Sequence, residues 1–188
     1  MRPRRRMATR RLRTRAESAN MTYVDPLVAG VRWQSDLPDL VGLRLPQLTL
    51  PSTDGIAINL AERSSHDIYV LHPVAMPREA FIELPLDATL QIGKSISTLL
   101  AFNDMLDNFE MAGIRVFGVS VQSRGLQSIV AASLGLRFPL LSDKNADLAR
   151  LLKLPMLRQG RLPRFAISVV EAKMGWITRH VRAVSTAD

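Results

Sequence analysis

Two runs of alternating residues lie on either side of a short polar turn near residue 51. The pattern of residues 43–50 indicates an extended segment, which ends at Pro51. The polar residues 52–55 supply turn chemistry, and Ile56, Ile58 and Leu60 then repeat at period two. Two such runs joined by a short polar turn are typical of a β-hairpin. We therefore predict a hairpin over these residues.

Short apolar runs further along the chain predict buried strands. The first, residues 68–71, is stopped by His72 and Pro73. A short, β-rich run with such an end is expected of a central strand that is buried on both faces. Residues 114–121 have the same character. Three further strands are predicted at residues 138–141, 164–170 and 176–181.

Apolar residues at helical spacing predict the longest helix. They are Ile96, Leu99, Leu100, Phe102, Leu106 and Phe109, and residues three and four apart share one helix face. Ser95 and Ser97 are the candidate N-caps, and Gly113 lies just past the expected end. Two more helices are predicted, one over residues 123–134 that ends at Gly135 and one from Ser142 and Asp143 to residue 152.

A long connection, residues 74–93, precedes that first helix. Pro73, Pro77 and Pro85 interrupt any regular element there, so we predict a surface loop with at most a short turn of helix. Strands that alternate with helices and then close in a hairpin build a mixed sheet with helices on its faces. The pattern therefore predicts an α/β fold, in one domain over residues 36–188.

Positive charge is concentrated at the N-terminus. The first 16 residues contain eight arginines and no acid, which leaves 17 basic residues against 17 acidic ones in the rest of the chain. We expect residues 1–35 to form a basic, disordered tail. It could contact polyanions such as nucleic acid nonspecifically through counterion release. The arginines of this tail are Arg2, Arg4, Arg5, Arg6, Arg10, Arg11, Arg13 and Arg15.

Two other interpretations of the tail stay open. It could be an Arg-rich organelle transit sequence, or translation could begin at Met7 or Met21. We expect a cytoplasmic protein, with organelle targeting by the tail as the alternative. No run of about 18 apolar residues occurs, so no transmembrane helix is expected.

The chain contains no cysteine. Disulfides, thiolate metal sites and thiol redox chemistry are therefore excluded for it. Three histidines, His66, His72 and His180, lack the spacing of metal ligands. We expect no metal and no cofactor.

Three strings give the sequence a resemblance to a known family. They are FGVSVQS at residues 117–123, GLRFPLLSD at residues 135–143 and RFAISV from Arg164. They look like the peroxiredoxins, the alkyl hydroperoxide reductase and thiol-specific antioxidant group, and more narrowly the bacterioferritin-comigratory type and its redoxin relatives. The resemblance extends from about residue 42 to residue 177. It implies a thioredoxin-like fold with an added N-terminal β-hairpin, and descent from a thiol-dependent peroxide reductase.

The resemblance also assigns the family's site residues. Pro73 corresponds to the proline that ends the strand before the active loop, and Ser95 corresponds to the peroxidatic cysteine in the first turn of a helix. Leu100 stands where a resolving cysteine would lie, and Ile92 where a small polar residue would bind the peroxide. Arg164 corresponds to the arginine that lowers the pKa of the thiol. Because serine cannot cycle through a sulfenic acid, we expect no peroxidase activity.

Several alternatives remain for these residues and for the chain. Ser95 could simply cap a helix, and Arg164 could pair with an acid at the surface. The chain could instead be an antioxidant oxidoreductase that uses the thiols of a partner, or an anion or nucleic-acid binder that acts through its tail. In the family a helix covers one face of the sheet after the last strand. If that face is uncovered here, a homodimer is expected.

Overall fold

The computed structural model describes residues 39–73, 75, 86–154, 156–159, 162–165 and 167–182 of the 188-residue chain. The predicted tail, residues 1–35, lies outside the described residues. So does most of the predicted loop, at residues 74 and 76–85.

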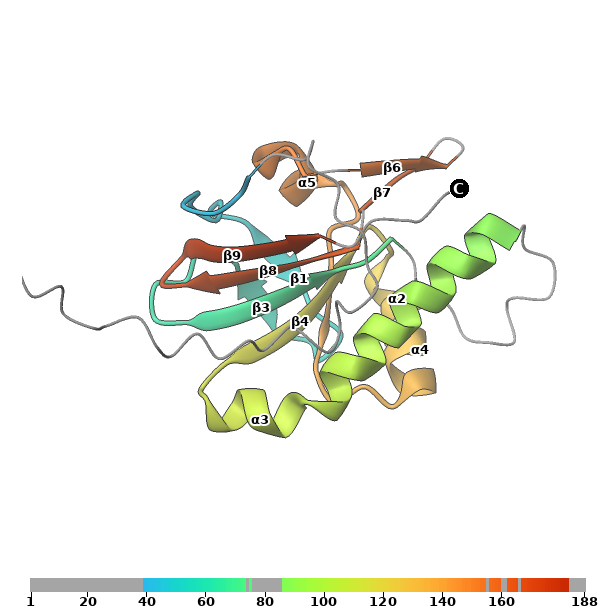
Figure 1. Cartoon of the computed structure of the whole chain (residues 1–188), viewed down its shortest axis with the longest axis horizontal. Helices are drawn as coiled ribbons and strands as arrows, with labels where there is room; N and C mark the ends of the chain where they lie inside the picture. The colour runs from blue at the N-terminus through green and yellow to red at the C-terminus, as the bar shows by residue number, and fades with distance from the viewer. Residues whose placement is uncertain are drawn as a thin grey trace, which may run out of the picture.

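A five-stranded mixed sheet forms the centre of the fold, in the order β5-β4-β3-β8-β9 (Figure 1). The apolar run at residues 68–71 lies in the central strand, where Ile68 pairs with Val116 in parallel and with Glu171 in antiparallel orientation. The predicted mixed sheet is confirmed. Its strands are β3 (His66–Leu71), β4 (Arg115–Ser120), β5 (Leu140–Ser142), β8 (Ser168–Lys173) and β9 (Trp176–Arg182). Because β3, β4 and β5 run parallel, their carboxyl ends meet, and we call this edge of the sheet the carboxyl edge.

Two short antiparallel ribbons accompany the sheet. The predicted hairpin is confirmed as β1 (Thr49–Pro51) and β2 (Ala57–Asn59), and Ser52 attaches it to β5 through a bridge to Leu141. The second ribbon, β6 (Met156–Gln159) with β7 (Leu162–Phe165), was not predicted. The single strand predicted over residues 164–170 is therefore wrong, because its first residues pair with β6 and only its later ones, in β8, pair with β3.

The helices are α2 (Leu86–Asp104), α3 (Leu106–Met111), α4 (Arg124–Leu134) and α5 (Asp147–Leu152). Helix α4 matches its prediction, since the Ser123 hydroxyl accepts from the Leu126 N–H and Gly135 ends the helix at φ 61°. The start of α2 does not match. The helix begins directly after Pro85, where a proline is tolerated, so the predicted loop was too long and neither Ser95 nor Ser97 is its N-cap. None of the described helices is long and apolar enough to span a bilayer.

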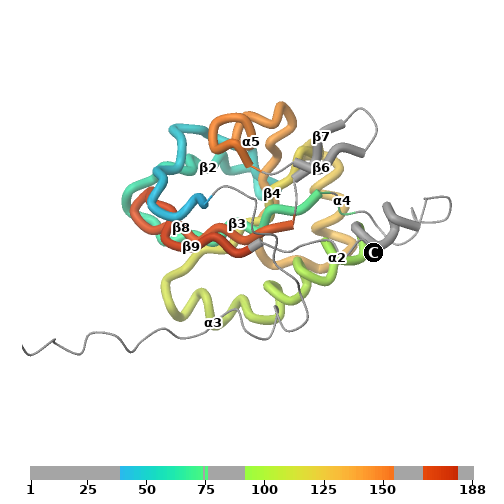
Figure 2. Tube along the Cα trace, turned by 45° about the horizontal axis from the view of Figure 1, so that its top comes forward, coloured from blue at the N-terminus to red at the C-terminus, as the bar shows by residue number. Residues whose placement is uncertain are grey.

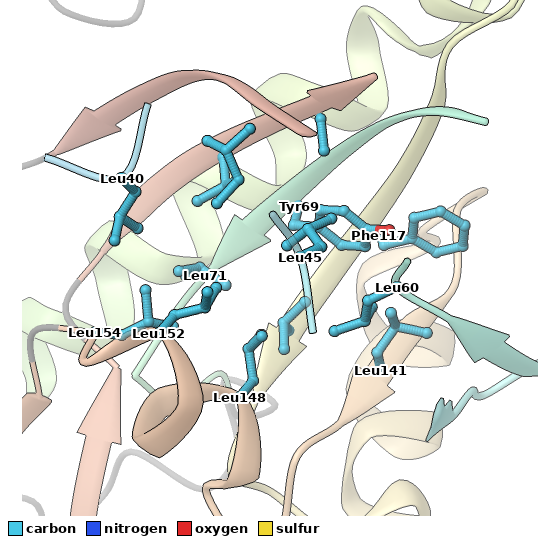
Figure 3. Close-up of a cluster of buried hydrophobic side chains, with 14 of the residues drawn as sticks. Leu40, Leu45, Leu60, Tyr69, Leu71, Phe117, Leu141, Leu148, Leu152 and Leu154 are labelled. Atoms are coloured by element: carbon cyan, nitrogen blue, oxygen red, sulfur yellow. The ribbon is translucent and has the colours of Figure 1, made fainter. Parts of the chain in front are cut away.

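Two hydrophobic clusters cover the two faces of the sheet, because successive strand residues point to opposite faces. On one face, residues of β3, β4 and β5 pack against α5 and the segment that contains the hairpin (Figures 2 and 3); this cluster includes Leu40, Leu60, Tyr69, Leu71, Phe117, Leu141 and Leu148. On the other face, the strands pack against α2, α3 and α4. That cluster includes Ile68, Val70, Leu99, Phe102, Phe109, Val116, Val130 and Leu140.

The turn between β8 and β9 offers a stabilising substitution. Met174 and Gly175 both have positive φ angles, 54° and 78°, as in a type I′ hairpin turn. Asparagine adopts this conformation more readily than methionine, and Met174 is 60% exposed. We expect Met174→Asn to raise the free energy of unfolding by about 0.5 kcal/mol, measured by urea denaturation. Met111→Asn, at an exposed methionine that ends a helix, should bring no gain; an equal gain would contradict the turn argument.

Candidate functional site

The carboxyl edge gathers buried polar residues from three strands. The three buried polar residues are His72, which follows β3, Ser120, which ends β4, and Ser142, which ends β5. Pro73, also buried, follows His72. In open α/β sheets, ligands bind at the carboxyl ends of the strands. This edge is therefore the candidate functional site of the fold.

The side chain of Gln122 ties the segment after β3 to the ends of its neighbours. Its amide Nε2 donates to the carbonyl oxygen of Ala75 at 3.0 Å, and the Ala75 N–H donates to its Oε1, also at 3.0 Å. The main chain of Gln122 is held in turn, since the Ser142 hydroxyl donates to its carbonyl oxygen at 2.7 Å. One glutamine therefore fixes the chain three residues beyond His72.

A second glutamine joins α4 to the same edge. The Gln127 amide is fully buried, and its Nε2 donates to the Ser120 hydroxyl at 2.9 Å and to the carbonyl oxygen of Leu141 at 2.8 Å. Its Oε1 has no hydrogen-bond partner among the described residues. These contacts hold the ends of β4 and β5 at a fixed position relative to α4.

Asp143 plays a structural role beside this edge. Its carboxylate accepts from the N–H groups of Asp147 at 2.8 Å and Leu148 at 3.1 Å, and it therefore caps α5. Burial raises the pKa of the Asp143 carboxyl, although these hydrogen bonds oppose the rise. The helix predicted from residue 142 begins only at Asp147, because the preceding residues form this cap.

His72 is the unusual residue of the edge. Its side chain is fully buried, and neither ring nitrogen has a hydrogen-bond partner among the described residues. The imidazole lies beside Gly118 of β4, where an added Cβ would be 3.6 Å from Nε2. Burial lowers the pKa of His72 to about 4. The ring is therefore neutral at pH 7.

The structure places the predicted site residues on separate elements. Pro73 lies at the carboxyl edge, as predicted from the strand end. Ser95 lies inside α2, nine residues after Leu86, and is 0% exposed, so it is not at the start of the helix. Arg164 lies in β7 opposite Leu157, in the separate ribbon and not in the central sheet. The correspondence of Ser95 and Arg164 to the family's catalytic positions stays a prediction.

Sequence reasoning missed the residues that organise the edge. Spacing tests His72 only as a metal ligand. Gln122 lies in the string at residues 117–123, but that string assigns its side chain no role, and Gln127 lies in none of the three strings. The available signal for His72 is weak: a polar residue that interrupts an apolar strand immediately before a proline. The sequence carries no signal for the hydrogen bonds of the two glutamine side chains, because their partners are distant in sequence. Ala75 and Gln122, for example, are 47 residues apart.

Comparisons with known proteins support the fold. Residues 95–172 match the model of the AhpC/TSA family. This match begins after the segment that links β3 to α2, so the part of the chain that precedes Ser95 is not included in it. No curated protein sequence matches significantly.

Several solved structures share the fold. A PrxQ mutant from Xylella fastidiosa is 18% identical, with a TM-score of 0.59 over 83% of this chain and 91% of that one. The peroxidoxin BcpB of Mycobacterium tuberculosis is 15% identical, with a TM-score of 0.62 over 78% and 87%. AhpC of Enterococcus faecalis is 12% identical, with a TM-score of 0.60 over 80% and 86%. At these identities the likeness concerns the fold.

The sheet, its hairpin and these structural neighbours define a thioredoxin-like α/β protein with the architecture of peroxiredoxins. Residues 95–172, less than half of the chain, are similar to the AhpC/TSA family, and the chain contains no cysteine.

Proposed function

We propose that this peroxiredoxin-like chain is a pseudoenzyme without peroxidase activity. The observation that carries the proposal is the absence of cysteine from all 188 residues. Reduction of a peroxide by this family's chemistry needs a thiolate that becomes a sulfenic acid and is then reduced. A serine hydroxyl cannot be oxidised to a sulfenic acid in this way. Burial of Ser95 inside α2 gives further support.

Peroxide consumption tests the proposal directly. The full chain is mixed with hydrogen peroxide and either dithiothreitol or a thioredoxin system, and we expect no consumption above the rate without protein. Consumption by the wild-type chain that depends on thioredoxin would overturn the proposal and would favour the alternative, an oxidoreductase that uses partner thiols.

A pair of cysteine variants tests the assignment of Ser95 separately. Ser95→Cys places a thiol at the predicted peroxidatic position, and Ser97→Cys places one at an exposed position of the same helix. If Ser95 marks the catalytic position, only Ser95→Cys turns over faster than a free thiol. Because Ser95 is buried in α2, we expect neither variant to do so.

We also propose a nonspecific polyanion contact through the tail. The support is the set of eight arginines without an acid in residues 1–16, next to a remainder of balanced charge. The full chain should elute from heparin at higher salt than a variant in which all eight arginines are glutamines. Equal elution would refute the contact.

The same two proteins test two further proposals. Sedimentation of each protein shows whether the chain forms a homodimer. Imaging of the full chain and of the glutamine variant in cells distinguishes a cytoplasmic location from targeting to an organelle by the tail.

A further inference from the structure

His72 lies where α2 packs against the sheet. The position of a Cβ added to Gly118 would be 3.2 Å from Leu99 Cδ2, 2.4 Å from Leu140 Cδ2 and 3.6 Å from His72 Nε2. A residue of α2, a residue of β5 and the imidazole therefore meet over one glycine of β4. Leu99 and Leu140 are fully buried and belong to the cluster that joins α2 to the sheet. The contacts of α2 with the sheet are therefore made directly beside the His72 imidazole.

Neither ring nitrogen of His72 has a hydrogen-bond partner among the described residues, and none of them places a carboxylate beside the ring. The buried carboxylate of Asp143, after β5, is directed to the N-terminus of α5, on the other face of the sheet. Leu99 of α2, Gly118 of β4 and Leu140 of β5 lie near the imidazole, and α4 packs on the same face of the sheet. The charged residues whose side chains are described in these four elements are all exposed. These are Lys94 and Asp104 in α2, Arg115 at the far end of β4, and Arg124 in α4.

We propose that His72 makes the docking of α2 on the sheet sensitive to acid. The neutral imidazole is compatible with the apolar contacts of Leu99 and Leu140, whereas a charged imidazole has no counter-ion among the described residues there and must reach water. We expect it to do so by a movement of α2 away from Gly118. The inference goes beyond the proposed loss of peroxidase activity and does not depend on it.

The sign and size of the effect follow from proton linkage. The pKa of His72 is about 4 in the folded chain, against 6.5 for an exposed histidine. The undocked state therefore binds the proton first, so docking is fully stable above pH 6.5 and is lost as the pH falls toward 4. Between pH 8 and pH 5 the docking equilibrium should fall roughly 30-fold. The raised pKa of Asp143 acts in the opposite direction, because it favours the folded state in acid.

The three histidines of the chain make the test direct. In protein labelled at histidine, NMR follows the three imidazoles between pH 8 and 4, and single substitutions assign them. Hydrogen exchange of the Leu99 and Phe102 amides, corrected for intrinsic rates, measures the docking of α2 at pH 8 and pH 5. We compare the wild-type chain with His72→Leu and with His66→Gln. His66 is the matched control, because its Nε2 lies 2.8 Å from the Glu171 carboxylate, away from α2.

The expected result has two parts. One imidazole, absent from His72→Leu, titrates well below pH 6.5, and the protection of the α2 amides falls roughly 30-fold at pH 5 in the wild-type chain and in His66→Gln but not in His72→Leu. Titration of all three imidazoles near pH 6.5 would overturn the proposal, as would an unchanged loss of protection in His72→Leu. If His72→Leu does not fold, the wild-type chain and His66→Gln still decide, because α2 amides that keep the same protection at pH 8 and pH 5 in both would overturn the proposal.

Discussion

Replacement of Asp67 by asparagine should lower the free energy of unfolding by about 2–3 kcal/mol. Asp67 is 1% exposed and is the common partner of two other residues. The Arg115 guanidinium donates to both of its carboxylate oxygens, at 2.7 and 3.0 Å, and the Tyr69 hydroxyl donates to Oδ2 at 3.0 Å. An asparagine removes the charge that Arg115 requires and replaces one acceptor oxygen by a donor. The loss stays below that of a fully buried pair, because Arg115 is 43% exposed and also contacts Glu62.

The state of Tyr69 is consistent with this dependence. Burial, followed by the nearby Asp67 charge, raises the pKa of Tyr69 well above its usual value, so its hydroxyl stays a donor. Urea denaturation at pH 7 measures the loss, and Asp107→Asn is the matched control. Asp107 pairs with Arg137 at 2.7 Å, but it is 71% exposed, so its replacement should cost less than about 1 kcal/mol. Losses of similar size for both variants would contradict a special role for the buried pair.

The sequence predicted the elements whose periodicity is local. The run at residues 68–71, the strand at residues 115–120 and the helix with Ser123 and Gly135 at its ends each carry their signal within a dozen residues. The errors concern pairing and boundaries. Nothing local distinguishes residues 162–165, which pair with β6, from residues 168–173, which pair with β3. Likewise, three prolines suggest an irregular segment although the last of them directly precedes α2.

The candidate site was less predictable for the same reason. Pro73 could be placed from the end of an apolar strand, but the hydrogen bonds of Gln122 and Gln127 join segments that only the fold brings together. The environment of the His72 imidazole is also a property of packing: its neighbours Leu99, Gly118 and Leu140 come from three different elements. Ser95 shows how a motif alignment can misplace a helix boundary. The alignment put Ser95 in the first turn of a helix, whereas α2 begins nine residues earlier, at Leu86.

Gly118→Ala should lower the free energy of unfolding by about 2–3 kcal/mol. The backbone of this glycine is not unusual; the reason is space. An added Cβ would lie 2.4 Å from Leu140 Cδ2 and 3.2 Å from Leu99 Cδ2, and both leucines are fully buried. Interiors are close-packed, so these side chains can move only by displacing others. Gly93→Ala is the control of opposite sign: Gly93 lies within α2 with nothing within 4 Å of an added Cβ, so alanine should stabilise the helix by about 0.5–1 kcal/mol.

A second substitution tests whether the clash with Leu140 is the cause. Leu140→Val removes the methyl group that the new Cβ would meet, and on its own it should cost about 1 kcal/mol. In the double variant the two losses should not add: the chain should be more stable than their sum predicts by about 1 kcal/mol, measured as a double-mutant cycle in urea. Additive losses would mean that Leu140 gives way easily and that the contact with Leu99, and hence the docking of α2, limits the space above Gly118.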